Sequence, residues 1–250
     1  MKIAVLGSGA WGTALSLLLQ KNGHEVTLWS YCEEECSALR ERGENKMLPG
    51  VPLPEGLPLT HREDVVAGCG LVVFAPPSYA MRQTALRVKP YLTPEAVLVT
   101  VAKGVEPESG LRMSEILAET LPGHPIAALS GPSHAEEVAR EMPTGCVAAC
   151  ADRAVAEWLQ GIFMNPSFRV YSSTDITGVE LCGAAKNIIA LAAGMAEGMG
   201  CGDNAKALMM SRALVELSAL IKAAGGEETT CFGLAGMGDM IVTCTSPHSR

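Results

Sequence analysis

A lysine and an asparagine lie in a mainly apolar segment in the last third of the chain. The segment GVELCGAAKNIIALAAGM (residues 178–195) places Lys186 and Asn187 among glycine, alanine and isoleucine residues. A buried, unpaired ammonium group is costly, so burial lowers the pKa of such a lysine and suits it to proton transfer. The alternative is a structural lysine that reaches solvent along the helix surface or forms an ion pair.

Three further segments combine glycine with charged or hydroxyl side chains: TVAKGVE (100–106), LSGPSHAEEVA (129–139) and GLAGMGDMIVTCTSPHSR (233–250). The first two follow β-like runs, and ligands of open α/β sheets bind beyond the carboxyl ends of the strands. Lys103 is therefore a candidate site residue, and Asp239, after Gly236-Met237-Gly238 in the third segment, is another. A solvated loop lysine and a turn aspartate are the alternative interpretations. His134, at a helix start, is more typical of a capping or packing residue than of an acid–base group.

The turn Gly7-Ser8-Gly9-Ala10-Trp11-Gly12 matches G-x-G-x-x-G, follows a β-like run and opens an apolar-periodic helix ending near Asn22-Gly23. In this pattern Gly7 permits the tight turn, Gly9 lets the backbone approach a pyrophosphate, and Gly12 lets helix and strand pack closely. The amino end of the helix adds partial positive charge. The pattern predicts a dinucleotide-binding turn, the alternative being a glycine-rich turn without a ligand.

The second β-like run, residues 25–29, indicates which dinucleotide is bound. NAD-selective sites usually carry an acidic residue at the end of this strand, where it binds the ribose hydroxyls and repels a 2′-phosphate. Here the sequence reads Trp29-Ser30-Tyr31-Cys32, and the acidic run 33–35 arrives later. We therefore expect NADP, or both NADP and NAD, to be used.

The first two-thirds of the chain alternate short apolar β-like runs with amphipathic helical stretches at 11–21, 32–42, 78–89 and 110–120. This order predicts a Rossmann-like, doubly wound, mainly parallel α/β sheet. Proline-rich residues 48–60 should form an extended surface loop. Strand signals stop near Asp175, so we expect a dinucleotide-binding domain over 1–174 and an all-α substrate domain over 175–250.

Composition limits the classes of partner. The chain has 250 residues, of which 48% are hydrophobic, and its net charge of −8 argues against general nucleic-acid binding. Nine cysteines are an odd number without the spacing of a disulfide framework, and no histidine follows at zinc-finger spacing. We expect a cytoplasmic protein with no metal, no secretory signal and no membrane span.

The segments SGPSHAEEVA, GVELCGAAKNIIALAAGM, GDNAKALMMSRALVE and GLAGMGDMIVTCTSPHSR resemble, in order, the signature blocks of the NAD(P)-dependent glycerol-3-phosphate dehydrogenases. The resemblance extends over essentially the whole chain. It implies reversible hydride transfer between a nicotinamide and C2 of dihydroxyacetone phosphate, which gives sn-glycerol 3-phosphate, a phospholipid precursor.

The resemblance also implies site roles. Lys186 would donate the proton in reduction and accept it in oxidation, and Asp239 would contact the hydroxyl end of the substrate and orient Lys186. Further substrate contacts would come from Lys103, Gly131, Ser133, Ser249 and Arg250. Cofactor contacts would come from Gly7, Gly9, Ala10, Trp11, Gly12, Tyr31, Lys103, Ala135 and Arg250.

Two features depart from the family pattern. Cys182 stands where glycine is common, and the sequence stops at Arg250, inside a Ser-Arg-Asn motif that further helices usually follow. We therefore expect full activity to need residues beyond Arg250. A ketopantoate-reductase-like enzyme and a non-catalytic NADP-binding module are the alternative functions, and a homodimer fits the alanine- and methionine-rich helices.

Overall fold

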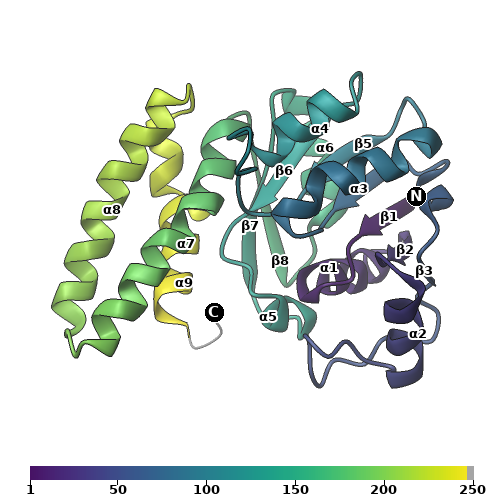
Figure 1. Ribbon diagram of the computed structural model, residues 1–250, viewed down its shortest axis with the longest axis horizontal. Coiled ribbons are helices and arrows are strands. Elements are labelled where there is room, and N and C mark those ends of the chain that lie inside the picture. Colours follow the sequence, from purple (N-terminus) through teal and green to yellow (C-terminus); the bar gives the residue numbers. More distant parts are fainter. Residues whose placement is uncertain (247–250) are drawn as a thin grey trace.

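The computed structural model describes residues 1–246 and contains one eight-stranded sheet with the strand order β3-β2-β1-β4-β5-β6-β7-β8 (Figure 1). The strands are β1 (Lys2–Leu6), β2 (Glu25–Trp29), β3 (Leu59–Thr60), β4 (Leu71–Phe74), β5 (Val97–Thr100), β6 (Ile126–Ser130), β7 (Thr144–Cys150) and β8 (Phe168–Ser173). Neighbouring strands are parallel except β6 and β7. The order of the first six strands is that of doubly wound dinucleotide-binding folds, which confirms the predicted fold class.

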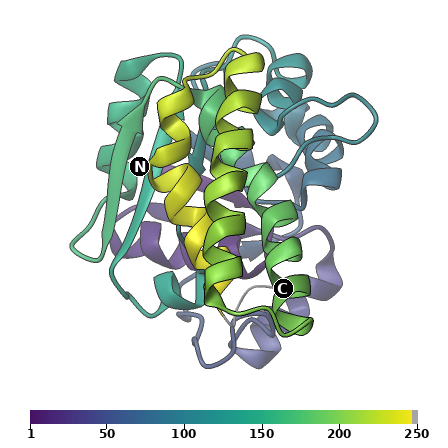
Figure 2. The same cartoon turned by 90° about the vertical axis from the view of Figure 1, so that its left-hand side faces the viewer.

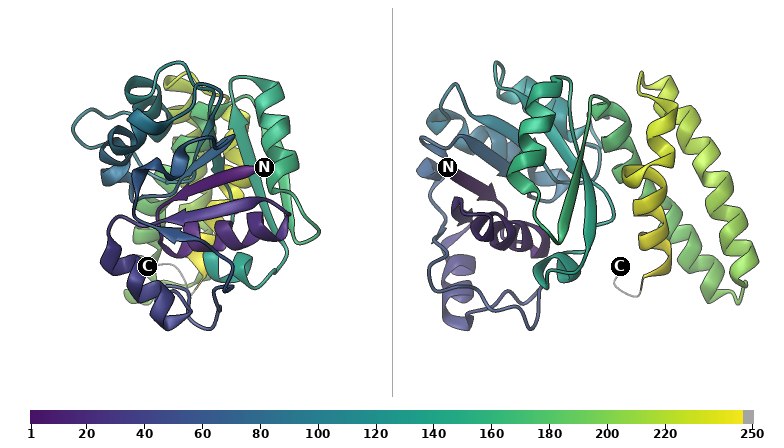
Figure 3. Two further views of the ribbon diagram at one scale, coloured as in Figure 1. Left: turned by 90° about the vertical axis from the view of Figure 1, so that its right-hand side faces the viewer. Right: turned by 180° about the vertical axis from the view of Figure 1, so that it is seen from behind.

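Helices cover both faces of this sheet (Figures 1 and 3). They are α1 (Ala10–Lys21), α2 (Glu33–Arg42), α3 (Met81–Val88), α4 (Met113–Thr120), α5 (Ala135–Ala139) and α6 (Arg153–Phe163). In β1, Ile3 and Val5 join the apolar core under α1, α5 and α6, whereas Ala4 and Leu6 join the core under α3 and α4. Because successive side chains of a strand point to opposite faces, a strand covered on both sides is apolar throughout.

The C-terminal region is helical and contains α7 (Ile176–Gly198), α8 (Asp203–Ala223) and α9 (Asp239–Thr245), which lie side by side beyond one end of the sheet (Figure 2). The Asp175 carboxylate caps α7 by accepting a hydrogen bond of 2.8 Å from the Gly178 amide. Strand β8 ends at Ser173 and α7 begins at Ile176, next to the domain boundary expected at 174/175. The division into two domains remains a prediction.

One helix of the described residues, α7, is long and apolar enough to cross a membrane, with 23 residues and a mean hydropathy of 1.4. Length and composition alone do not test the expectation of no membrane span, which stays a prediction. The helix contacts α8, α9, β6 and β7, and it carries two charged residues, Glu180 and Lys186, that are buried within the protein. Core helices of globular proteins show the same length and apolar composition.

The proline-rich segment 48–60 differs from the expected surface loop. It is irregular for most of its length, but Leu48, Val51 and Leu57 are buried in the core cluster that contains α1. The segment ends in β3, a two-residue strand that extends the sheet beyond β2. Two residues are too few to show an alternating pattern, so the sequence did not reveal this strand.

Candidate active site

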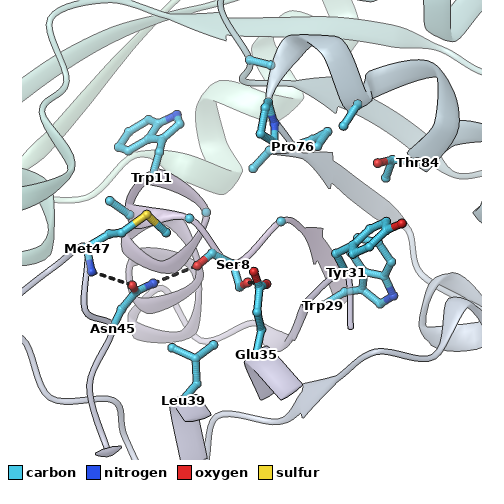
Figure 4. Close-up of a pocket in the computed structure, with 18 of the residues that line it drawn as sticks. Ser8, Trp11, Trp29, Tyr31, Glu35, Leu39, Asn45, Met47, Pro76 and Thr84 are labelled. Carbon is cyan, nitrogen blue, oxygen red and sulfur yellow. Dashed lines mark hydrogen bonds between the residues drawn. The ribbon is translucent and has the colours of Figure 1, made fainter. Parts of the chain in front are cut away.

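A pocket of about 740 Å³ opens beyond the carboxyl ends of β1, β2 and β4, and the glycine turn forms one of its walls (Figure 4). Gly7 has a φ of 129°, and a Cβ atom there would lie 2.5 Å from the Ala75 carbonyl oxygen. A Cβ atom on Gly12 would lie 1.9 Å from the Gly7 carbonyl oxygen, whereas one on Gly9 would meet nothing closer than 4.0 Å. Gly7 and Gly12 are therefore needed for packing, and Gly9 keeps one backbone face open to the pocket.

The pocket fits the pyrophosphate of NAD or NADP. Helix α1 begins at Ala10, its N-cap residue Gly9 provides no side-chain cap, and both residues line the pocket. Uncapped amides at a helix amino end attract an anion through hydrogen bonding and the helix dipole. Asn45 holds the turn in place, because its Nδ2 donates to the Ser8 carbonyl oxygen at 2.8 Å and to Thr13 Oγ1 at 2.7 Å.

Next to this pocket, two lysines converge on one buried carboxylate. Asp239, at the start of α9, is 1% exposed and accepts hydrogen bonds from Lys186 of α7 and, at 2.6 Å, from Lys103. Lys103 also donates to the Gly131 carbonyl oxygen at 3.1 Å, and Lys186 to Thr243 Oγ1 at 2.9 Å. Lys103 directly follows Ala102, which lines the dinucleotide pocket, so this cluster borders the place where a bound nicotinamide could react.

The surroundings of Lys186 favour proton exchange near neutral pH. The residue is 7% exposed, and burial, with the nearby charge of Lys103 as a second cause, lowers its pKa to about 8. Contact with Asp239 opposes this shift, so the ammonium form persists despite its burial. An amine with this pKa can donate a proton to an alkoxide and recover it within the physiological pH range.

Small residues let the two lysine-bearing segments approach each other. A Cβ atom on Gly183 of α7 would lie 3.3 Å from Lys103 Cγ and 3.0 Å from Ser130 Oγ. Cys182, the departure from the family pattern, is fully buried in the apolar cluster of the helical region. Burial raises the pKa of its thiol, so it remains protonated there.

The structure brings most of the sequence-predicted site residues into these two adjoining places. Six line the pocket: Gly7, Gly9, Ala10, Trp11, Gly12 and Tyr31. Lys103, Gly131, Lys186 and Asp239 form the hydrogen-bonded cluster, and Ser133 Oγ donates to the Gly131 carbonyl oxygen at 3.0 Å. Ala135 is buried at the start of α5 and does not line the pocket. Ser249 and Arg250 lie outside the described residues.

Sequence reasoning missed two members of the site. Thr243 donates to the Asp239 carbonyl oxygen at 2.6 Å and accepts from Lys186. Its position four residues after Asp239, on the same face of one helix, was the available signal. Glu35 lines the pocket although it lies in α2, beyond the end of β2.

A Rossmann-like sheet with an open glycine turn, bordered by a buried lysine–aspartate pair, defines a nicotinamide-dependent oxidoreductase. Comparison with known families is more specific, since the models described as NAD-dependent glycerol-3-phosphate dehydrogenase N-terminus and C-terminus match residues 2–156 and 175–250. The chain therefore belongs to the NAD-dependent glycerol-3-phosphate dehydrogenase family.

Individual relatives agree with this assignment. The chain is 52% identical to the glycerol-3-phosphate dehydrogenase [NAD(P)+] of Moorella thermoacetica, over 99% of this chain and 74% of the relative. It is 49% identical to that of Desulfitobacterium hafniense, over 100% and 71%. The crystal structure of glycerol-3-phosphate dehydrogenase from Coxiella burnetii superposes with a TM-score of 0.94 at 38% identity, over 99% of this chain and 77% of that one.

A ketopantoate reductase from Ralstonia eutropha shares only the fold, with a TM-score of 0.66 and 23% identity. Of the three functions considered from the sequence, the comparisons favour the glycerol-3-phosphate dehydrogenase. The chain is an NAD(P)-dependent oxidoreductase of that family.

Proposed function

We propose that Lys186 is the acid–base group with which this chain interconverts dihydroxyacetone phosphate and sn-glycerol 3-phosphate, the reaction of its family. The observation that carries this role is a buried lysine with a pKa near 8, held by Asp239 beside the dinucleotide pocket. Bound NADH or NADPH supplies the hydride that the carbonyl carbon accepts. Side chains of the protein donate or accept the proton and stabilise the charge that develops on the substrate oxygen.

In reduction, negative charge develops on the C2 oxygen as its carbonyl bond is broken. The Lys186 ammonium stabilises this charge and then donates its proton to the oxygen. In oxidation the neutral amine accepts the hydroxyl proton. Asp239 and Thr243 each bond Lys186 Nζ, which fixes its direction and leaves its remaining proton for the substrate.

The other proposed contacts bind the ends of the substrate. Lys103, Gly131 and Ser133 are linked through the Gly131 carbonyl oxygen, so they can form one wall of the substrate site. Asp239 would also contact the hydroxyl end. Ser249 and Arg250 remain proposed phosphate contacts, because arginine presents donors that match a phosphate group.

The test is Lys186→Ala. We expect loss of dihydroxyacetone phosphate reduction with NAD(P)H binding nearly unchanged, because this lysine touches the reacting oxygen and does not line the dinucleotide pocket. Lys222→Ala is the matched control, since Lys222 pairs with Glu228 on the surface of α8 and should be dispensable. Near wild-type turnover in Lys186→Ala, or reduction of ketopantoate instead of the phosphate, would contradict the proposal.

The remaining proposals concern the setting of the reaction. We propose a cytoplasmic enzyme, not inserted in a membrane, that supplies a phospholipid precursor; the nine free cysteines fit a reducing compartment. A homodimer is supported by exposed apolar side chains on α7 and α8, among them Ile188, Leu191, Met195 and Leu208. Light scattering that gives a monomer mass would exclude the dimer.

A further inference from the structure

The acidic residue that the sequence does not place at the end of β2 reaches that position from the next helix. Glu35 lies in the first turn of α2, and its Oε2 accepts hydrogen bonds from Ser30 Oγ at 2.5 Å and from Ser8 Oγ at 3.1 Å. Ser30 directly follows β2, and Ser8 is part of the glycine turn. Figure 4 shows Glu35 and Ser8 pointing toward each other inside the pocket, with Trp11 on one side and Tyr31 on the other.

Dinucleotide-binding folds bind the adenosine ribose at this position, beyond the end of the second strand. A carboxylate there accepts hydrogen bonds from the ribose hydroxyls and repels a 2′-phosphate. The two serines occupy Oε2, so Oε1 of Glu35 can accept from the ribose. Ser30 Oγ also lies 2.7 Å from Ser8 Oγ, so the carboxylate cannot turn away from a phosphate without losing its bond to this linked pair of hydroxyls.

Arg87, which contacts residues at the end of β2, is engaged with other groups. Arg87 donates from Nε to Glu63 at 2.9 Å, pairs with the same carboxylate through Nη2, and donates from Nη1 to the Tyr31 carbonyl oxygen. Its guanidinium lies 5.0 Å from the Trp29 ring centroid and 4.8 Å from that of Tyr31. These contacts hold it at the end of β2, and it does not line the pocket.

Two other cations, Arg42 and Lys46, line the same pocket. Arg42 lies on the Glu35 face of α2 but two helical turns further along, which is about 10 Å. Lys46 is exposed in the segment that follows the helix. Glu35, by contrast, is hydrogen-bonded to Ser30, the residue that directly follows β2.

We propose that Glu35 is a specificity-determining residue that makes this enzyme favour NADH over NADPH. In the sequence, the acidic run 33–35 begins several residues after β2, which favours NADP. In the fold, however, the side chain of Glu35 lies at the end of β2. Repulsion between a carboxylate and a 2′-phosphate at this range corresponds to about a tenfold difference in affinity, or about 1.4 kcal/mol.

The experiment measures dissociation constants of NADH and NADPH by titration calorimetry in the wild type and in Glu35→Gln, which keeps the shape but removes the charge. We expect the wild type to bind NADH about tenfold more tightly, and Glu35→Gln to bind NADPH about tenfold more tightly than the wild type does, with NADH changed less than about threefold. Glu34→Gln, with the same charge change outside the pocket lining, should alter neither constant.

Tighter binding of NADPH than of NADH by the wild type would overturn the proposal, and so would an NADH-to-NADPH ratio that Glu35→Gln leaves unchanged. This proposal rests on the dinucleotide pocket of the proposed function, and the experiment distinguishes failure of the pocket from failure of the Glu35 role. Binding of neither dinucleotide would remove the pocket's role altogether, whereas equal discrimination in both proteins would remove the role of Glu35 alone.

Discussion

Replacing Asp239 by asparagine should move the pH dependence of ketone reduction to lower pH. Asp239 is the buried carboxylate that both Lys186 and Lys103 contact, and its charge favours the ammonium form of Lys186. Without it, burial and the charge of Lys103 remain, and both lower the pKa of Lys186. Since the ammonium form is the proton donor, the variant should lose activity at a pH where the wild type is fully active.

The size of the shift follows from the contact. A single opposite charge at hydrogen-bonding distance typically changes a pKa by about 1–3 units. Lys186, with a pKa of about 8, would then titrate at about pH 5–7 in the variant. At about pH 7.5 the protonated fraction would fall from about three quarters to a few per cent, if the shift is about two units.

The assay is kcat for dihydroxyacetone phosphate reduction with saturating cofactor, measured from about pH 5 to about pH 10. The wild type should lose activity as the pH rises through about 8. Asp239→Asn should show this loss at lower pH, and Lys103→Met should show it at higher pH, because removing the like charge of Lys103 raises the pKa of Lys186.

Opposite shifts from the two variants are a result that general loss of structure cannot produce. Circular dichroism and a thermal melt check that each variant is folded. If Asp239→Asn does not fold, Asp239→Glu keeps the charge and should retain the wild-type midpoint. If the midpoint of the activity loss stays near pH 8 in both Asp239→Asn and Lys103→Met, the titrating group is not Lys186.

Two further predictions concern positions that hold the site together. Gly12→Ala should abolish NAD(P)H binding and lower the melting temperature, because the added Cβ would lie 1.9 Å from the Gly7 carbonyl oxygen. Binding at wild-type affinity, measured by calorimetry, would contradict this prediction. Arg112→Ala should reduce the free energy of unfolding by about 3–5 kcal/mol in a urea titration, because it leaves the buried Glu180 carboxylate of α7 without its counter-charge at 2.7 Å. Arg62→Ala, which breaks a fully exposed pair with Asp64, is the control and should have no measurable effect.

The sequence by itself determined the features that depend on short-range spacing. The glycine turn needs small residues at three fixed positions, and the apolar strands need two covered faces, so both can be read within about ten residues. Lys186 among small apolar residues likewise indicated a buried amine, since its neighbours in a helix are set by the helical repeat. The antiparallel pairing of β6 with β7 left no comparable local mark.

Only the tertiary structure decided which distant groups meet. Lys103 and Asp239 are 136 residues apart, and they form one ion pair because α7 packs against β6 and α9 packs against α7. Glu35 arrives six residues after β2 ends, yet the first turn of α2 returns its carboxylate to Ser30. The physical reason is the same in both cases: local spacing fixes the direction of a side chain within its own element, whereas the packing of elements against one another fixes which side chains it faces.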